Sequence, residues 1–174
     1  LSGRLSGVEE IAALKLLMEK LGSNNIDCRE TGSKINAADP ASYSFNTTIS
    51  GIDQADSCLL IGVNPRITAP IINARLRKRF LTKKLKIAAI GVDSDLTYEY
   101  QNLGNQVQIL QDILDGKSAY NSVLENSNYP MLIIGEEMLK RADGELILNY
   151  AKKIAEKYKM INGDWNGFNM LHNN

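Results

Sequence analysis

The chain has 174 residues, 44% of them hydrophobic, and its 20 basic side chains balance its 20 acidic ones. This length suits one domain of ordinary size, or one lobe of something larger, that folds without a disulfide or a metal ion. A net charge of zero argues against a protein that binds nucleic acids or membrane surfaces through general charge attraction. No apolar run approaches the roughly 18 residues of a membrane-spanning helix.

The first predicted element is a helix that starts near residue 8. Ser6 and Glu9 have the spacing of a capping box, and Gly22 suits the end of the helix. Apolar residues recur between them at helical spacing, at Ile11, Leu14, Met18 and Leu21. The polar stretch 31–48 then predicts a long loop, and a loop of that length inside a compact domain is often functional.

Three apolar runs, each ending in glycine, predict the strands of a central sheet. They are residues 58–62, 87–91 and 131–135. Because these runs are continuous rather than alternating, they are typical of strands that are buried on both faces. The spacing of apolar residues predicts helices between and after the strands, at residues 70–80, 107–114, 118–125 and 143–158.

This alternation predicts an α/β fold with three α/β/α layers, in which helices cover both faces of an open, mostly parallel sheet. Gly62, Gly91 and Gly135 then mark the carboxyl ends of strands, which is where such sheets bind ligands. No domain boundary is visible, so residues 1–174 are expected to form a single domain. No signal-peptide pattern is present at the start of the sequence. Because the first residue is Leu1, we expect a fragment or a processed piece of a longer protein.

Few residues have the pattern of a catalytic or metal site. Cys28 and Cys58 are far apart and form no C-x-x-C unit, which excludes a disulfide scaffold, a zinc knuckle or a cysteine-ligated cluster within the chain. His172, the only histidine, has no Asp or Cys close in sequence, which argues against an activated nucleophile. The sequence therefore predicts no catalytic residue and no metal ligand.

Two further patterns favour structural roles. Gly116-Lys117-Ser118 looks like the end of a phosphate-binding loop, but position 111 carries Gln rather than the required Gly. A helix end followed by a helix start explains this triplet better. Near the end of the chain, Trp165, Phe168 and Leu171 have helix-like spacing and predict an apolar packing stripe.

Residues 66–86 form a basic stretch without any acidic side chain. Its basic residues are Arg66, Arg75, Arg77, Lys78, Arg79, Lys83, Lys84 and Lys86. Because aromatic residues that could stack on bases are not interleaved with them, nucleic-acid binding is not favoured. Two interpretations stay open, a solvated helix face and a docking strip for an acidic protein partner.

Several stretches resemble, in order and spacing, the molybdopterin oxidoreductase family, which includes formate dehydrogenases and nitrate reductases. They are residues 22–27, 49–56 and 60–65, followed by Pro70. A second series resembles one branch of that family more closely, the large iron–sulfur subunit of NADH:quinone oxidoreductase (respiratory complex I). These are residues 64–78, 95–98, 103–104, 109–113 and 163–172, so the resemblance covers essentially the whole chain.

The resemblance implies a formate dehydrogenase/DMSO reductase-like lobe that has lost its cofactor. In molybdenum enzymes a strand-end G-x-N-P loop contacts the pterin–guanine dinucleotide, and Gly62, Asn64 and Pro65 occupy that loop here. The family's Asp-Pro-Arg and Pro-Gly-Thr-Asp turns are replaced by residues 91–93 and 103–106. Because dinucleotide phosphates need several converging cationic and amide donors, we expect a vestigial loop that binds no cofactor.

Two consequences of the resemblance concern metals. Ser33 lies near the position of the family's molybdenum ligand, but its neighbours do not fit, so no metal ligand is expected. The iron–sulfur clusters of the large iron–sulfur subunit are held by cysteine-rich domains nearer the start of the full protein. The resemblance therefore places these clusters in the missing upstream part and none within this fragment.

The function that the resemblance implies is a degenerate domain, without an active site of its own, that scaffolds the peripheral arm of complex I. Its partners would be other peripheral-arm subunits, with no nucleic acid and no direct membrane insertion. The complex would lie on the cytoplasmic face of the bacterial inner membrane or the mitochondrial matrix side. Two alternatives stay open: an active molybdopterin-dependent lobe with Ser33 as ligand, and a small-anion or nucleotide-binding module that uses residues 62–66.

Overall fold

The computed structural model describes residues 6–26, 32 and 39–172, and its chain divides into two compact units, residues 1–32 and 33–174. Ser33 and Cys28, two residues of interest in the sequence, lie outside the described residues. Among the described residues, no helix combines the length and the apolar composition that crossing a bilayer requires. Whether 1–174 is a single domain stays a prediction.

The first unit contains one helix, α1 (Val8–Lys20). The amide of Gly7 donates to Oε2 of Glu10 at 3.2 Å, so the predicted Ser6/Glu9 capping pair is wrong by one residue. The shift arises because the helix begins at Val8, which makes Gly7 the N-cap and Glu10 the third helical residue. Gly22, with φ of +68°, follows the helix end as predicted.

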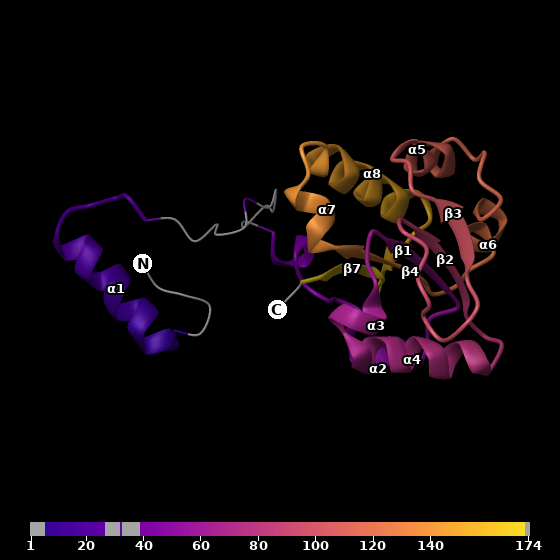
Figure 1. Ribbon diagram of the computed structural model, residues 1–174, viewed down its shortest axis with the longest axis horizontal. Helices are drawn as coiled ribbons and strands as arrows, with labels where there is room; N and C mark the ends of the chain where they lie inside the picture. Colours follow the sequence, from indigo (N-terminus) through magenta and orange to yellow (C-terminus); the bar gives the residue numbers. More distant parts are fainter. Residues whose placement is uncertain (1–5, 27–31, 33–38, 173–174) are drawn as a thin grey trace. The chain divides into compact units, whose positions relative to one another are not determined.

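The second unit is built around a five-stranded sheet in which all neighbouring strands are parallel (Figure 1). The strand order is β3-β2-β1-β4-β7. The strands are β1 (Ser57–Ile61), β2 (Lys86–Ile90), β3 (Gln101–Gly104), β4 (Pro130–Gly135) and β7 (Phe168–Leu171). The three strongly apolar runs are the three central strands, which confirms the predicted parallel α/β sheet.

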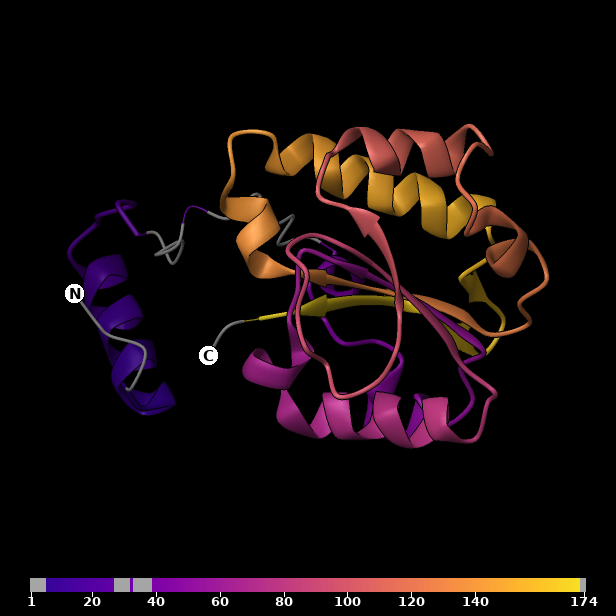
Figure 2. The same ribbon diagram turned by 45° about the vertical axis from the view of Figure 1, so that its right-hand side comes forward.

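Helices cover both faces of this sheet, as Figure 2 shows, so the predicted three-layer arrangement is confirmed. One layer contains α2 (Thr48–Gly51), α3 (Pro65–Thr68) and α4 (Pro70–Leu81). The other contains α5 (Gln108–Leu114), α6 (Asn121–Glu125), α7 (Glu136–Lys140) and α8 (Gly144–Lys157). A short 3₁₀ turn, η1 (Pro40–Ser42), precedes the first layer in the chain.

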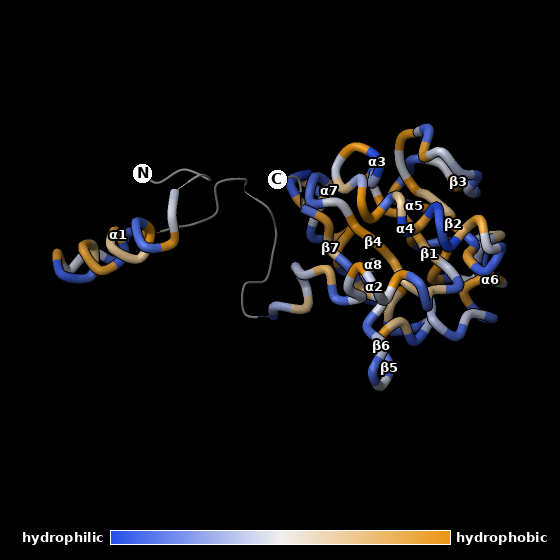
Figure 3. The backbone as a smooth tube through the Cα atoms, turned by 90° about the horizontal axis from the view of Figure 1, so that it is seen from below, coloured by the Kyte–Doolittle hydropathy of each residue, from blue (hydrophilic) through white to orange (hydrophobic). Residues whose placement is uncertain are grey.

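The sheet separates two apolar cores, and successive residues of β1 belong to different ones. Leu59 packs with residues of α5 to α8, whereas Cys58 and Leu60 share a core with Ile72 and Leu76 of α4. Figure 3 shows the apolar strands at the centre of the unit. Because residues 58–61 of β1 each enter a core, this run is apolar throughout, which is the pattern that identified the strand in the sequence.

Tyr120 ties the amino ends of β1 and β2 to the α5–α8 layer. Its hydroxyl lies 2.8 Å from the carbonyl oxygen of Lys86 and 3.1 Å from that of Cys58, and it accepts a hydrogen bond from the amide of Cys58. The side chain is 1% exposed, and burial raises the pKa of the hydroxyl. The neutral hydroxyl therefore satisfies backbone groups that water cannot reach.

The chain end differs from the prediction, because Trp165, Phe168 and Leu171 lie on strands rather than on a helix. A hairpin of β5 (Ile161–Asn162) and β6 (Trp165–Asn166) turns at Gly163, whose φ is +55°. All three residues are buried, as a packing stripe requires. A spacing of three residues is typical of one helix face, but here it does not indicate a helix. In this strand, which is buried on both faces, Phe168 enters one core and Leu171 enters the other.

Part of the polar stretch 31–48 covers the outer edge of β7. Phe45 forms an antiparallel bridge with Asn169, and the amide of Met170 donates to the carbonyl of Ser44 at 3.0 Å. The buried Asn169 side chain also donates to Oγ1 of Thr47 at 2.8 Å. In the structure, residues 39–48 therefore cover the edge strand β7 and protect its otherwise unpaired backbone groups.

Replacing Tyr120 by phenylalanine is expected to lower the free energy of unfolding by about 1–3 kcal/mol, because backbone groups of Lys86 and Cys58 lose a buried partner. Urea unfolding followed by circular dichroism measures this change. Tyr129→Phe is the matched control, since Tyr129 is 44% exposed and keeps its ring. Equal effects of the two substitutions would contradict the role given to the Tyr120 hydroxyl.

Candidate functional site

The carboxyl ends of β1, β2 and β4 meet at three glycines, as the sequence predicted. The amide of Gly62 donates to the carbonyl of Ile90 at 2.7 Å. A Cβ added to Gly135 would lie 2.6 Å from the carbonyl oxygen of Gly62, and a Cβ added to Gly91 would lie 3.4 Å from the Cα of Gly62. Three strand ends approach this closely only because none of these residues has a side chain.

Met138 of α7 fills the space beside Gly62. A Cβ on Gly62 would overlap the Sδ, Cγ and Cε atoms of Met138, and Gly62 itself has a φ of +57°. The methionine also packs against the core beneath α5 to α8. A flexible thioether side chain is well suited to filling an irregular gap of this kind.

The loop residues that follow Gly62 build the start of a helix. Oδ1 of Asn64 accepts a hydrogen bond from the amide of Arg66 at 3.1 Å, which makes Asn64 the N-cap of α3. Pro65 is buried and occupies the first turn of that helix. The carbonyl of Asn64 accepts from the amide and the hydroxyl of Thr68. Asn64 and Pro65 are therefore engaged within their own loop.

An ion pair joins the loop after β1 to the loop after β2. Nη1 of Arg66 donates to Oδ2 and to the carbonyl oxygen of Asp95, at 2.5 Å and 3.0 Å. Oδ1 of Asp95 accepts from the amide of Thr97 at 2.8 Å. These bonds, first that from Thr97 and then that from Arg66, lower the pKa of Asp95. The cation nearest the loop in sequence thus has a carboxylate partner in this structure.

A second polar contact lies where β4 and β7 end. Oε2 of Glu136 is 3.5 Å from Nδ1 of His172, and Nε2 of that imidazole lies 2.6 Å from the carbonyl oxygen of Tyr43. Glu136 is 7% exposed. The two side chains meet because β4 and β7 are neighbours, a pairing that sequence spacing did not predict. The contact fastens the segment before β1 to the sheet.

Cys58 does not reach this site. It lies in the middle of the unit, 0% exposed, and burial raises the pKa of its thiol, which keeps the sulfur neutral and unreactive. The described residues contain no group of three or more His, Cys, Asp or Glu side chains arranged to hold a metal ion.

The arginines of the basic stretch are bound to neighbouring loops. Nη1 of Arg75 lies 2.9 Å from Oδ2 of Asp53, and Nε of Arg79 donates to the carbonyl of Ala55 at 2.9 Å. Nε of Arg77 donates to the carbonyl of Thr97. These bonds attach α4 to the loops before β1 and after β2. Lysines beyond the far end of α4 are exposed, and no side-chain hydrogen bond or ion pair to a described residue is seen for Lys83, Lys84 and Lys86.

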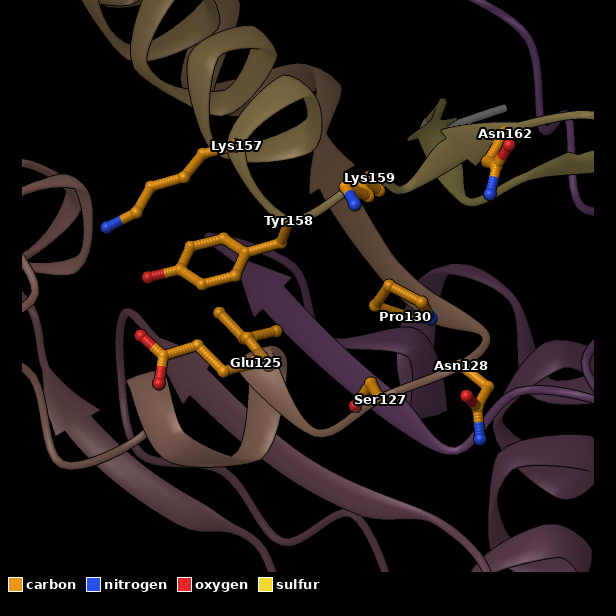
Figure 4. Close-up of a pocket in the computed structure, with 9 residues that line it drawn as sticks. Glu125, Ser127, Asn128, Pro130, Lys157, Tyr158, Lys159 and Asn162 are labelled. Carbon is orange, nitrogen blue, oxygen red and sulfur yellow. The ribbon is translucent and has the colours of Figure 1, made fainter.

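A hollow of about 420 Å³ lies at the opposite, amino end of the sheet, between α6, α8 and the start of β4 (Figure 4). Sequence reasoning did not predict it. Tyr158 lies between Lys157 and Glu125 in this view. Nζ of Lys157 donates to the carbonyl of Leu114 at 2.8 Å, and Oγ of Ser127 donates to the carbonyl of Val123. With these groups engaged in helix ends and loops, the hollow has no evident catalytic arrangement.

Comparison with known proteins decides the family. The family model for molybdopterin oxidoreductase matches residues 1–174. The chain belongs to the molybdopterin oxidoreductase family. It is 41% identical over 173 residues to the G subunit of NADH-quinone oxidoreductase from Rickettsia prowazekii, a match that covers 99% of this chain and 26% of that protein. It is 40% identical over 173 residues to the protein of the same name from Rickettsia typhi, again covering 99% and 26%.

A plant relative extends this similarity. The chain is 36% identical over 170 residues to NADH dehydrogenase [ubiquinone] iron-sulfur protein 1, mitochondrial, of Solanum tuberosum, covering 98% of this chain and 23% of that protein. The chain thus spans about a quarter of the length of the curated relatives it matches. The resemblance to this NADH:quinone oxidoreductase branch that the sequence motifs indicated is confirmed.

Within this molybdopterin oxidoreductase domain, the residues at the strand-end loop do not fit a dinucleotide. Met138 adjoins Gly62, Asn64 caps a helix with its side-chain oxygen, and Arg66 pairs with a carboxylate. A dinucleotide there would need several free donors aimed at its phosphates. In this loop the amide of Gly62, the side-chain oxygen of Asn64 and the guanidinium of Arg66 are engaged with the protein itself.

Replacing Gly62 by alanine is expected to cost about 2–4 kcal/mol of stability, because the new Cβ overlaps Met138 and alanine disfavours a positive φ. In urea unfolding, the Gly62→Ala/Met138→Ala double variant should lose at least ~1 kcal/mol less than the sum of the single variants. Gly163→Ala is the matched control, since its φ of +55° is similar but no atom lies within 4 Å of the added Cβ. Strict additivity at Gly62 and Met138 would contradict the contact.

Proposed function

We propose that this chain is a degenerate, cofactor-free molybdopterin oxidoreductase domain of the large iron–sulfur subunit of NADH:quinone oxidoreductase. The observation that carries the proposal is the Met138 side chain packed beside Gly62, where the family's strand-end loop would contact a pterin–guanine dinucleotide. A bound pterin needs open space and free donors next to that loop. This chain has a thioether, a helix cap and an ion pair there instead.

The domain then serves as a scaffold rather than as a catalyst. Two apolar cores stabilise its sheet without help from a ligand, and the outer edge of β7 is covered by residues 39–48. Such a fold persists when a cofactor is lost, because function resides in a site that the fold carries rather than in the fold itself. The domain presents a rigid surface and contributes no redox group of its own.

The names of the relatives support a proposal about partners and location. They are named as subunits of NADH-quinone oxidoreductase and as an iron–sulfur protein of mitochondrial NADH dehydrogenase. We infer that this chain assembles with other peripheral-arm subunits, and that iron–sulfur clusters belong to the part of the polypeptide outside residues 1–174. The complex would lie on the cytoplasmic face of a bacterial inner membrane or the matrix side of a mitochondrial one.

Within that assembly, the lysines from the turn after α4 to the first residue of β2 are the proposed contact for an acidic subunit surface. Lys83, Lys84 and Lys86 are exposed, whereas Arg75 and Arg79 are held by the domain's own loops. Exposed charges of one sign steer association and fix orientation more than they add affinity. The docking strip is therefore shorter than the basic stretch in the sequence.

Intact complex containing the full-length subunit is expected to hold far less than one molybdenum atom and one pterin per subunit. Elemental analysis by mass spectrometry measures the metal, and acid oxidation followed by fluorescence measures the pterin, with a formate dehydrogenase as positive control. Stoichiometric molybdenum would favour the active lobe instead. Stoichiometric release of a guanine nucleotide without metal would favour the small-anion or nucleotide module.

Reversing two charges in the docking strip should weaken assembly. A full-length subunit with Lys83→Glu and Lys84→Glu is expected to bind its partner subunits about 10-fold more weakly at low salt, with the difference shrinking as salt rises. Lys152→Glu with Lys153→Glu on α8 is the control, since it changes net charge equally on the other helix layer. If both double variants reconstitute with equal affinity, the strip is ordinary solvated surface.

A further inference from the structure

The dipeptide Asn-Gly occurs twice in the chain, at residues 162–163 in the β5–β6 hairpin and at residues 166–167, where β6 ends. Asparagine before glycine is chemically labile, because glycine has no Cβ to hinder attack of its backbone nitrogen on the asparagine side chain. The attack requires that this nitrogen is free of a hydrogen bond and that the local chain can move. The structure gives the two dipeptides opposite surroundings in both respects.

Asn162 and Gly163 are exposed and weakly restrained. No hydrogen bond to another described residue is seen for the Asn162 side chain or for the Gly163 amide, and no atom lies within 4 Å of a Cβ built on Gly163. The hairpin pairs only two residues of each strand, and a hairpin of that size is marginally stable in water. Its turn therefore opens at a low cost in free energy.

The second dipeptide is held at each group that would react. The amide of Gly167 donates to the carbonyl of Met160 at 2.7 Å, so the attacking nitrogen is engaged. Oδ1 of Asn166 accepts from the amide of Phe168 at 3.1 Å. Gly167 is buried, and a Cβ on it would lie 2.2 Å from the carbonyl oxygen of Pro130. Turning this peptide toward the asparagine side chain would break these contacts.

We propose that Asn162 is a site of spontaneous covalent modification, whereas the fold protects Asn166. The amide nitrogen of Gly163 loses its proton to solvent and bonds to Cγ of Asn162, and the Cγ–Nδ2 bond breaks to release ammonia. Water then opens the cyclic imide. Cleavage of the new bond to Cγ leaves aspartate, and cleavage at the main-chain carbonyl leaves isoaspartate.

Either product changes the hollow at the amino end of the sheet. Asn162 lines that hollow together with Lys157 and Lys159, so a carboxylate at position 162 adds a negative charge to a lining that already contains two lysines (Figure 4). Isoaspartate also lengthens the main chain of β5 by a methylene group. This disturbs the pairing of Asn162 with Trp165 on β6.

Peptide mapping by mass spectrometry tests the proposal on the full-length subunit after incubation at mildly alkaline pH. Deamidation should be at least ~10-fold faster at Asn162 than at Asn166, because the second site must open before it can react. In urea the two rates should agree within about 3-fold, since an unfolded chain holds neither dipeptide. Both aspartate and isoaspartate should be present at position 162, because the imide opens on either side.

Asn162→Gln is the matched variant. It keeps a side-chain amide at the same place, but attack on the longer side chain forms a larger and less favoured ring. The hairpin peptide should then stay unmodified over the same incubation, with an unchanged circular dichroism spectrum.

Three results would overturn the proposal. They are equal rates at Asn162 and Asn166 in the folded protein, modification of Asn162 only in urea, and aspartate as the sole product, which would indicate direct hydrolysis without attack by Gly163. The chemistry uses only this chain and water, so the inference does not rest on the proposed function. Bound molybdenum would refute the proposed function and leave this result unchanged.

Discussion

The close approach of three strand ends at Gly62 is the constraint on which the site depends. The backbone of Gly62 lies so near Gly135 that a side chain at position 135 would press on its carbonyl oxygen, and a Cβ at Gly91 would already be in van der Waals contact with its Cα. Parallel strands bring their carboxyl ends to one edge, and a wide gap between diverging loops is what lets such an edge bind a ligand. Here the gap beside Gly62 is taken by Met138 of the short helix α7, which follows β4.

Once that position is filled, the remaining polar groups of the edge satisfy one another. Asn64 caps α3, Arg66 reaches Asp95 across two loops, and Glu136 meets His172. Of these groups, the guanidinium of Arg66 is a donor that a bound anion could otherwise meet, and here it is paired with a carboxylate. In our proposal, the apolar cores keep the family's architecture while the residues of the ligand loop have become part of the fold. This is the physical sense in which we propose that the domain is a scaffold.

The sequence predicted the central sheet well because β1, β2 and β4 are apolar at nearly every position, a signal that does not depend on distant residues. It missed β3, which has one apolar residue, Leu103, is mostly exposed, and pairs with β2 at the edge of the sheet. It also misread the chain end, where Phe168 belongs to a strand defined by its pairing with β4. Both failures concern elements whose state is decided by tertiary pairing rather than by local pattern.

In the candidate site, too, some features have a local sequence signal and others depend on tertiary contacts. Gly62, Asn64 and Pro65 were found as a loop from their motif, and their place at a strand end is confirmed. The contact between Met138 and Gly62 had no local signal, since a methionine in a helix predicts only general packing. The partner of His172 was equally hidden, because it depends on the β4–β7 pairing.

The most direct test is a high-resolution structure of the intact complex, focused on the edge where β1, β2 and β4 end. Our account predicts the thioether of Met138 packed beside Gly62, with Arg66 paired to Asp95 and no further density between these loops. A pterin lying between the loops, with Met138 displaced and Arg66 turned toward its phosphates, would contradict the account.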